Sequence, residues 1–78
     1  MSARHRQAKK RLHAMEVERA RLALVLVAYA TVIADVLDDQ EPAPAFLHER
    51  HKQTSDAIVY LDKRIADEAG KLQADLDG

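Results

Sequence analysis

The stretch that decides the fold is LALVLVAYATVIADVL, residues 22–37, near the middle of a 78-residue chain. Its uncharged part, Leu22–Ala34, spans 13 residues and is apolar except for Thr31. A helix that crosses a bilayer needs about 20 such residues, so we expect neither a membrane span nor a secretory leader. A run that is apolar on every side predicts instead a helix that protein covers on more than one side.

The rest of the composition is that of a single small helical domain, residues 1–78. The chain has two glycines, two prolines, three aromatic residues and no cysteine. The absence of cysteine excludes a disulfide framework and a thiolate metal site or nucleophile within this chain. It agrees with a reducing compartment, and we expect a cytoplasmic protein.

One break interrupts the helical pattern, the segment DDQEPAPAF of residues 38–46. Pro42 disfavours the α conformation at the residue before it, and Pro44 suits the first turn of a new helix. We predict a first helix over about residues 3–39, a turn over about 40–43, and a second helix over about 44–76. The short connection makes the helices antiparallel neighbours, an all-α two-helix hairpin.

Apolar residues recur at alternating steps of three and four in both predicted helices, which indicates one buried stripe on each. The first stripe comprises Leu12, Met15, Arg19, Leu22, Leu26, Tyr29, Ile33 and Val36. The second comprises Leu47, His51, Thr54, Ile58, Leu61, Ile65, Ala69, Leu72 and Leu76. In a hairpin, residues whose numbers add to about 83 lie level, so Tyr29 faces Thr54 as a buried polar layer. Arg19 interrupts its stripe and is expected to pair with Glu68 or to extend its charged end past the edge of the core. The alternative is a contact with a partner.

Charge is segregated along the chain. Residues 1–21 carry seven Lys or Arg against two glutamates, and residues 22–49 carry five acids and no Lys or Arg. Antiparallel packing brings the basic start beside the acidic C-terminus, and it brings Asp35, Asp38 and Asp39 beside the basic residues that open the second helix. Surface ion pairs contribute only about 0–1 kcal/mol each, so they favour an orientation more than they add stability.

A single neighbouring helix cannot cover residues 22–34 on all sides. We therefore expect two hairpins to pack first helix on first helix, as a homodimeric antiparallel four-helix bundle with its twofold axis near residues 27–30. A higher oligomer or a different obligatory partner remains an alternative. The residues expected in the dimer interface are Leu22, Ala23, Leu26, Val27, Ala30, Ile33 and Ala34.

No pattern of residues indicates catalysis, and we expect no enzyme, cofactor or metal. There is no cysteine and no glycine-rich phosphate loop. His48 and His51 share a helix face and can approach Asp35 or Asp38, but the HERH spacing matches no zinc-peptidase or di-iron motif. Ordinary hydrogen-bonding roles account for these histidines.

The function that these patterns favour is a small protein-interaction module, a regulator, adaptor or inhibitor from a bacterium, phage or plasmid that docks on a larger protein. Aromatic residues dominate interface hot spots, so the candidate contacts are Phe46 and Tyr60, with Arg19 beside them. The alternative is a nucleic-acid-binding regulator, because an N-terminal cluster of cations can neutralise phosphates. That cluster comprises Arg4, Arg6, Lys9, Lys10 and Arg11.

Overall fold

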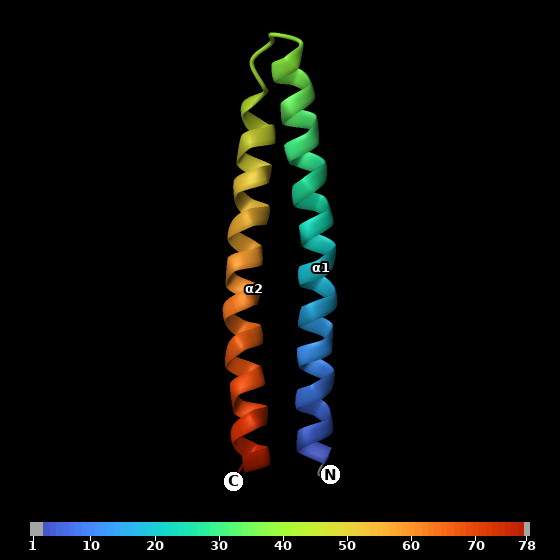
Figure 1. The fold of residues 1–78 in the computed structure, drawn as a ribbon, viewed down its shortest axis with the longest axis vertical. Helices are drawn as coiled ribbons and strands as arrows, with labels where there is room; N and C mark the ends of the chain where they lie inside the picture. The colour runs from blue at the N-terminus through green and yellow to red at the C-terminus, as the bar shows by residue number, and fades with distance from the viewer. Residues whose placement is uncertain (1–2, 78) are drawn as a thin grey trace.

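A computed structural model describes residues 3–77 as two long helices, α1 (Ala3–Asp38) and α2 (Ala45–Asp77). They run side by side in opposite directions over their whole length, with both termini at one end (Figure 1). The predicted all-α helical hairpin is confirmed. Each helix begins and ends within one residue of the predicted position.

A left-handed residue ends α1. Gln40 has φ 63° and is the single non-glycine residue with positive φ among residues 3–77. The Gln40 N–H donates to the Leu37 carbonyl at 3.0 Å, and the Glu41 N–H donates to the Val36 carbonyl at 3.3 Å. This pair of bonds is the Schellman motif, which satisfies the last carbonyls of a helix and usually places glycine at the left-handed position. The motif turns the chain back toward α2.

The second proline of the break stands at the entry to α2. Its helix begins at Ala45, one residue after Pro44. The Leu47 N–H donates to the Pro44 carbonyl at 3.0 Å, so Pro44 closes the first turn as an acceptor. Because Pro44 has no N–H of its own, it leaves no unsatisfied donor at this end.

The seam between the helices follows the predicted stripe of α1, since all eight of its residues are half-buried. In α2, Leu47, Ile58 and Leu72 are each 8% exposed and are the most buried apolar residues described. The end of the predicted α2 stripe is wrong, because Ala69 and Leu76 are exposed and Glu68 is half-buried. From Ile65 the seam continues by a step of three and then a step of four to Leu72, which keeps one face toward α1.

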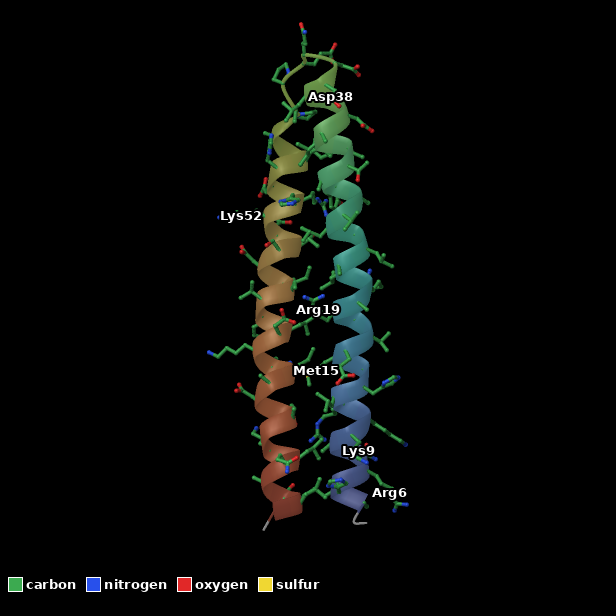
Figure 2. The ribbon with its side chains drawn as sticks, in the orientation of Figure 1. Arg6, Lys9, Met15, Arg19, Asp38 and Lys52 are labelled. Carbon is green, nitrogen blue, oxygen red and sulfur yellow. The ribbon has the colours of Figure 1, made fainter. Side chains whose placement is uncertain are left out.

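Two ion pairs join the helices. Arg19 Nε lies 2.9 Å from Asp62 Oδ1, and Arg11 Nη2 lies 3.9 Å from Glu68 Oε2. Arg19 lies between the two helices in Figure 2. The expected pairing of Arg19 with Glu68 is therefore wrong. The Arg19 side chain pairs instead with Asp62, which lies nearer the turn. Within the described range, Asp35, Asp38 and Asp39 are exposed and take no part in an ion pair, so the expected pairing at the turn does not form.

The polar layer expected between Tyr29 and Thr54 is also different from the prediction. Both residues are half-buried rather than buried. The Thr54 hydroxyl donates to the Arg50 carbonyl of its own helix at 2.8 Å. A hydroxyl that bonds within its own helix supplies no bond across the seam, so it does not determine the register.

The hairpin is long and thin. Its extents are 58 × 15 × 14 Å and its radius of gyration is 17.6 Å, whereas a compact chain of this length has a radius of about 11–12 Å. Among the described residues no side chain is fully buried. Two helices meet along one line only, so even the seam residues remain partly open to their surroundings.

Replacing Gln40 by glycine is expected to stabilise the hairpin. The left-handed conformation costs an L-residue about 1–2 kcal/mol. Glycine avoids this cost, but it loses more conformational entropy on folding, which offsets about 0.5–1 kcal/mol of the gain. We expect Gln40→Gly to raise the free energy of unfolding by roughly 0.5–1 kcal/mol, measured by urea unfolding followed by circular dichroism at one protein concentration. Gln40→Ala retains the left-handed strain and serves as the control. Equal stability of the two variants would contradict this account of the turn.

Candidate functional site

A second apolar stripe runs along α1, on the side that α2 does not cover. Its residues again alternate in steps of three and four, and all are exposed: Val17, Ala20, Leu24, Val27, Thr31 and Ala34. Leu24 is 75% exposed, Val27 63% and Val17 56%. We call these six residues the outward stripe. It contains no charged side chain and spans 18 residues, about 26 Å of helix.

The outward stripe lies nearly opposite the seam. Leu24 falls midway between Leu22 and Leu26 of the seam, and two residues correspond to about 200° of helical rotation. Val27 follows Leu26 by one residue and lies about 100° around the helix. The middle of α1 therefore has two apolar faces that point in different directions.

No comparable stripe occurs on the described part of α2. Its exposed large apolar residues are Phe46, Val59, Tyr60 and Leu76, which do not follow a repeating three-and-four spacing. Scattered apolar residues of this kind are normal on a protein surface, whereas a continuous patch marks an interaction site. Self-association or docking is therefore expected on α1 first.

The residues predicted for a dimer interface divide between the two faces of α1. Leu22, Leu26 and Ile33 are half-buried in the hairpin seam, so α2 already covers them in part, and their place in a dimer interface stays a prediction. Val27 and Ala34 belong to the outward stripe. The two remaining residues, Ala23 and Ala30, flank that stripe on one side, and Ala28 flanks it on the other. Alanine in these flanking positions lets a second helix approach closely, because interaxial distance depends on side-chain size at the contact.

The hairpin has more accessible surface area than a compact protein of the same mass. It exposes 5964 Å², whereas a compact protein of this mass exposes about 4,700 Å². The excess of about 1,200 Å² is larger than the roughly 800 Å² that each partner contributes to a standard stable interface. One more contact of ordinary size would remove about two-thirds of this excess.

By length and composition, α1 also contains an 18-residue window that is apolar enough to cross a membrane, and none of this window is buried in the hairpin. This window is longer than the run of 13 uncharged residues in the sequence, and it extends beyond that run into positions that carry charge. Core helices of other proteins and N-terminal leaders meet the same criterion. The finding therefore identifies α1 as an apolar helix that α2 covers only in part, and it does not specify what covers the rest.

A charged pair lies beside the N-terminal part of the outward stripe. Arg21 Nε donates to Glu18 Oε2 at 2.9 Å, and a second bond joins Arg21 Nη2 to Glu18 Oε1. These hydrogen bonds lower the pKa of Glu18 below its ordinary value of 4.5 and raise the pKa of Arg21. In the seam, the hydrogen bond from Arg19 to Asp62 raises the pKa of Arg19 in the same way.

The residues predicted to contact a larger protein have different surroundings. Phe46 is 61% exposed and Tyr60 is 60% exposed, so both are accessible. The Arg64 guanidinium lies 5.8 Å from the centre of the Tyr60 ring, within the range of a cation–π contact. Arg19 is half-buried and bonded to Asp62, with its side chain 42% exposed, so its contact with a partner stays a prediction.

The basic residues at the start of α1 lie mainly in solvent. Arg4, Arg6, Lys9 and Lys10 are exposed, and the Arg11 side chain is 57% exposed although it pairs with Glu68. We call these five residues the basic run. His5 is buried within it, at 9% exposure, and was missed in the sequence. The signal was present, because the seam spacing extends backward from Leu12 through Ala8 to His5.

The described residues form no metal-binding cluster, and comparison with known proteins finds no relative. Within residues 3–77 no group of three or more His, Asp or Glu side chains is placed to hold a metal ion. His48 is exposed and His51 is half-buried in the seam. Comparison with known proteins finds no matching family model, no similar curated protein and no similar solved structure.

The Glu18–Arg21 pair is expected to make folding sensitive to acid. Because the pKa of Glu18 is lowered in the folded state, the unfolded chain binds more protons, and the stabilisation present above pH 4.5 is lost as the pH falls through the folded pKa. We expect the fall in melting temperature between about pH 6 and about pH 3 to be smaller in Glu18→Gln than in the original chain. Glu16→Gln, at an exposed carboxylate on the same helix that joins none of the described ion pairs, is the control. Identical acid sensitivity of Glu18→Gln and the original chain would rule out this contribution.

Proposed function

We propose that the protein is a non-enzymatic interaction module whose hairpins associate through the outward stripe, α1 against α1. The product is a homodimer of four helices with the two α1 helices in the middle. Because the stripe lies nearly opposite α2, this four-helix bundle is flattened. The observation that carries the proposal is the exposure of the uncharged outward stripe, centred on Leu24 and Val27.

The alternative cover for this stripe is lipid, and the charges of α2 argue against it. The register of the hairpin places residues 46–63 of α2 beside residues 20–37 of α1. The α2 segment carries the exposed charges Glu49, Lys52 and Asp56, and Lys52 projects away from α1 (Figure 2). A hairpin inserted with α1 in the hydrocarbon would take these charges with it, at a cost of about 2.5–3.5 kcal/mol each. A protein surface covers α1 without that cost, so the proposal places the protein in the cytoplasm and not in a membrane.

The dimer would then act by docking on a larger protein. With both α1 stripes covered, the surfaces that remain are the outer faces of the two α2 helices and the two ends. Phe46 and Tyr60 are the exposed aromatic residues on those faces, and aromatic side chains are the usual anchors of protein interfaces. A regulator, adaptor or inhibitor is the class of activity that such a surface supports.

A second candidate function is nucleic-acid binding by the basic run, which is favoured by the exposure of all five of its cations. Phosphate contacts by Lys and Arg release counterions, so such binding weakens steeply with salt. The described residues of the run include no aromatic side chain for stacking on bases. This function is therefore the weaker of the two.

Placing a carboxylate in the outward stripe is expected to separate the dimer into hairpins. In Val27→Glu both copies would bury an unpaired charge, and we expect self-association to weaken by more than about 100-fold. The measurement is sedimentation equilibrium or light scattering over a range of concentrations, with circular dichroism to follow helix content.

Val32→Glu is the matched control for this variant. Val32 is also a partly exposed valine of α1, but it precedes Ile33 of the seam and so lies on the other side of the helix from Val27. We expect it to remain dimeric. A wild-type chain that is monomeric at micromolar concentration, or a Val27→Glu dimer as tight as the original, would overturn the proposed function.

The nucleic-acid alternative has its own test. If the basic run binds phosphates, a mobility shift with duplex DNA or with RNA at low salt should be lost on raising the salt. It should also be lost in a variant with Lys9, Lys10 and Arg11 changed to glutamine, while Lys63→Gln and Arg64→Gln on α2 should leave it unchanged. Absence of any shift at low salt would remove this alternative.

A further inference from the structure

We propose that the occupant of the outward stripe is a second copy packed antiparallel, with Leu24 of one copy opposite Val27 of the other. This inference rests on the proposed self-association and adds its orientation and register. The centre of the stripe lies between residues 25 and 26, and a twofold axis at that centre lets each copy cover the whole stripe of the other. The axis predicted from the sequence, near residues 27–30, lay slightly closer to the turn.

At this register the outer pair joins a large side chain to a small one, and the central pair joins two large apolar side chains. Val17 lies opposite Ala34 of the second copy, Ala20 opposite Thr31, and Leu24 opposite Val27, each pair occurring twice by symmetry. Every residue of the outward stripe therefore has a counterpart. A large side chain opposite a small one packs without a void, as at the two ends of this stripe. The flanking residues Ala23, Ala28 and Ala30 keep the two helices free to approach.

The charges beyond the stripe select the antiparallel orientation. A parallel pair would place the two basic runs side by side and the two acidic turns side by side. The antiparallel pair places Lys10 of one copy level with Glu41 of the second, and His13 level with Asp38. Glu16 is level with Asp35, a like charge, but these two lie on opposite edges of the outward stripe, about 100° apart around the helix. All six residues are exposed in the single hairpin. Asp38 and Glu41 join no ion pair within the described hairpin. Juxtaposed like charges oppose association, while opposite charges steer it and determine the register.

The full chain allows a direct test because it contains no cysteine, so any introduced thiol is unique. Val17→Cys and Ala34→Cys are mixed in equal amounts under mild oxidation. The disulfide between the two variants is expected at least about tenfold in excess over the self-disulfide of either, because only facing thiols meet the ~4.4–6.8 Å Cα separation that the bond requires. Both positions are exposed in the hairpin, so the fold tolerates the change.

Other outcomes overturn the inference in distinguishable ways. Efficient self-disulfide formation by Val17→Cys would mean a parallel dimer. Efficient self-disulfide formation by Ala28→Cys without the mixed bond would mean an antiparallel dimer shifted toward the turn. Either result refutes the register or orientation and leaves the proposed dimer standing. Absence of every disulfide from a chain that light scattering shows to be monomeric refutes both the inference and the proposed function.

A charge reversal tests the electrostatic step separately. Asp38→Lys puts a cation near His13 and Lys10 of the second copy, and we expect dimer affinity to fall about three- to tenfold at low salt and to recover at high salt. The same change improves the interaction with the C-terminal dipole of α1, so a weaker dimer cannot be explained by a weaker helix. Asp56→Lys on the outer face of α2 is the control. Unchanged affinity in Asp38→Lys would overturn the placement of the turn beside the basic run of the second copy.

Discussion

The constraint on which the structure depends is that α1 has two apolar faces and α2 covers only one of them. The first face lies in the seam with α2, where Leu22, Leu26 and Ile33 are half-buried. Leu24 and Val27 point elsewhere and are among the most exposed apolar side chains described. Burial of apolar surface contributes about 25 cal/mol of favourable free energy for each Å² removed from water. A chain this thin therefore has much to gain from one further contact.

The fold could be predicted from the sequence because its determinants are local. The prolines at 42 and 44 mark the break, and the three-and-four spacing marks the seam on each helix. What failed depended on details that spacing does not encode. Ala69 was predicted in the seam because it is apolar, but Glu68 takes that place. The alternation of steps of three and four continues past Ile65 and leads to residue 68. Gln40 takes the left-handed position of the turn although glycine is the usual residue there, and nothing in the sequence marked it.

The candidate site was predictable in kind and less so in detail. An apolar run that is too broad for one neighbour predicts an additional contact, and the apolar residues that stay exposed on α1 are the candidates for it. Leu22 and Leu26 were expected in both the seam and the dimer interface, because a one-dimensional list of apolar residues does not divide a helix into faces. Arg19 shows a similar limit. Its long side chain reaches Asp62 at 2.9 Å, which lies closer to the turn than the level register predicts.

The basic run and the acidic turn are involved in both candidate functions. Self-association and nucleic-acid binding would therefore compete for the same cations. If the acidic turn of one copy lies beside the basic run of the other, those cations are partly neutralised before any phosphate arrives. Phosphate binding gains its free energy from releasing counterions that surround the nucleic acid, but it must then also displace Asp38 and Glu41 of the second copy. Arg11 is already held by Glu68 within its own hairpin. Covering the outward stripe with a second antiparallel copy therefore favours protein docking through α2 over nucleic-acid binding through the start of α1.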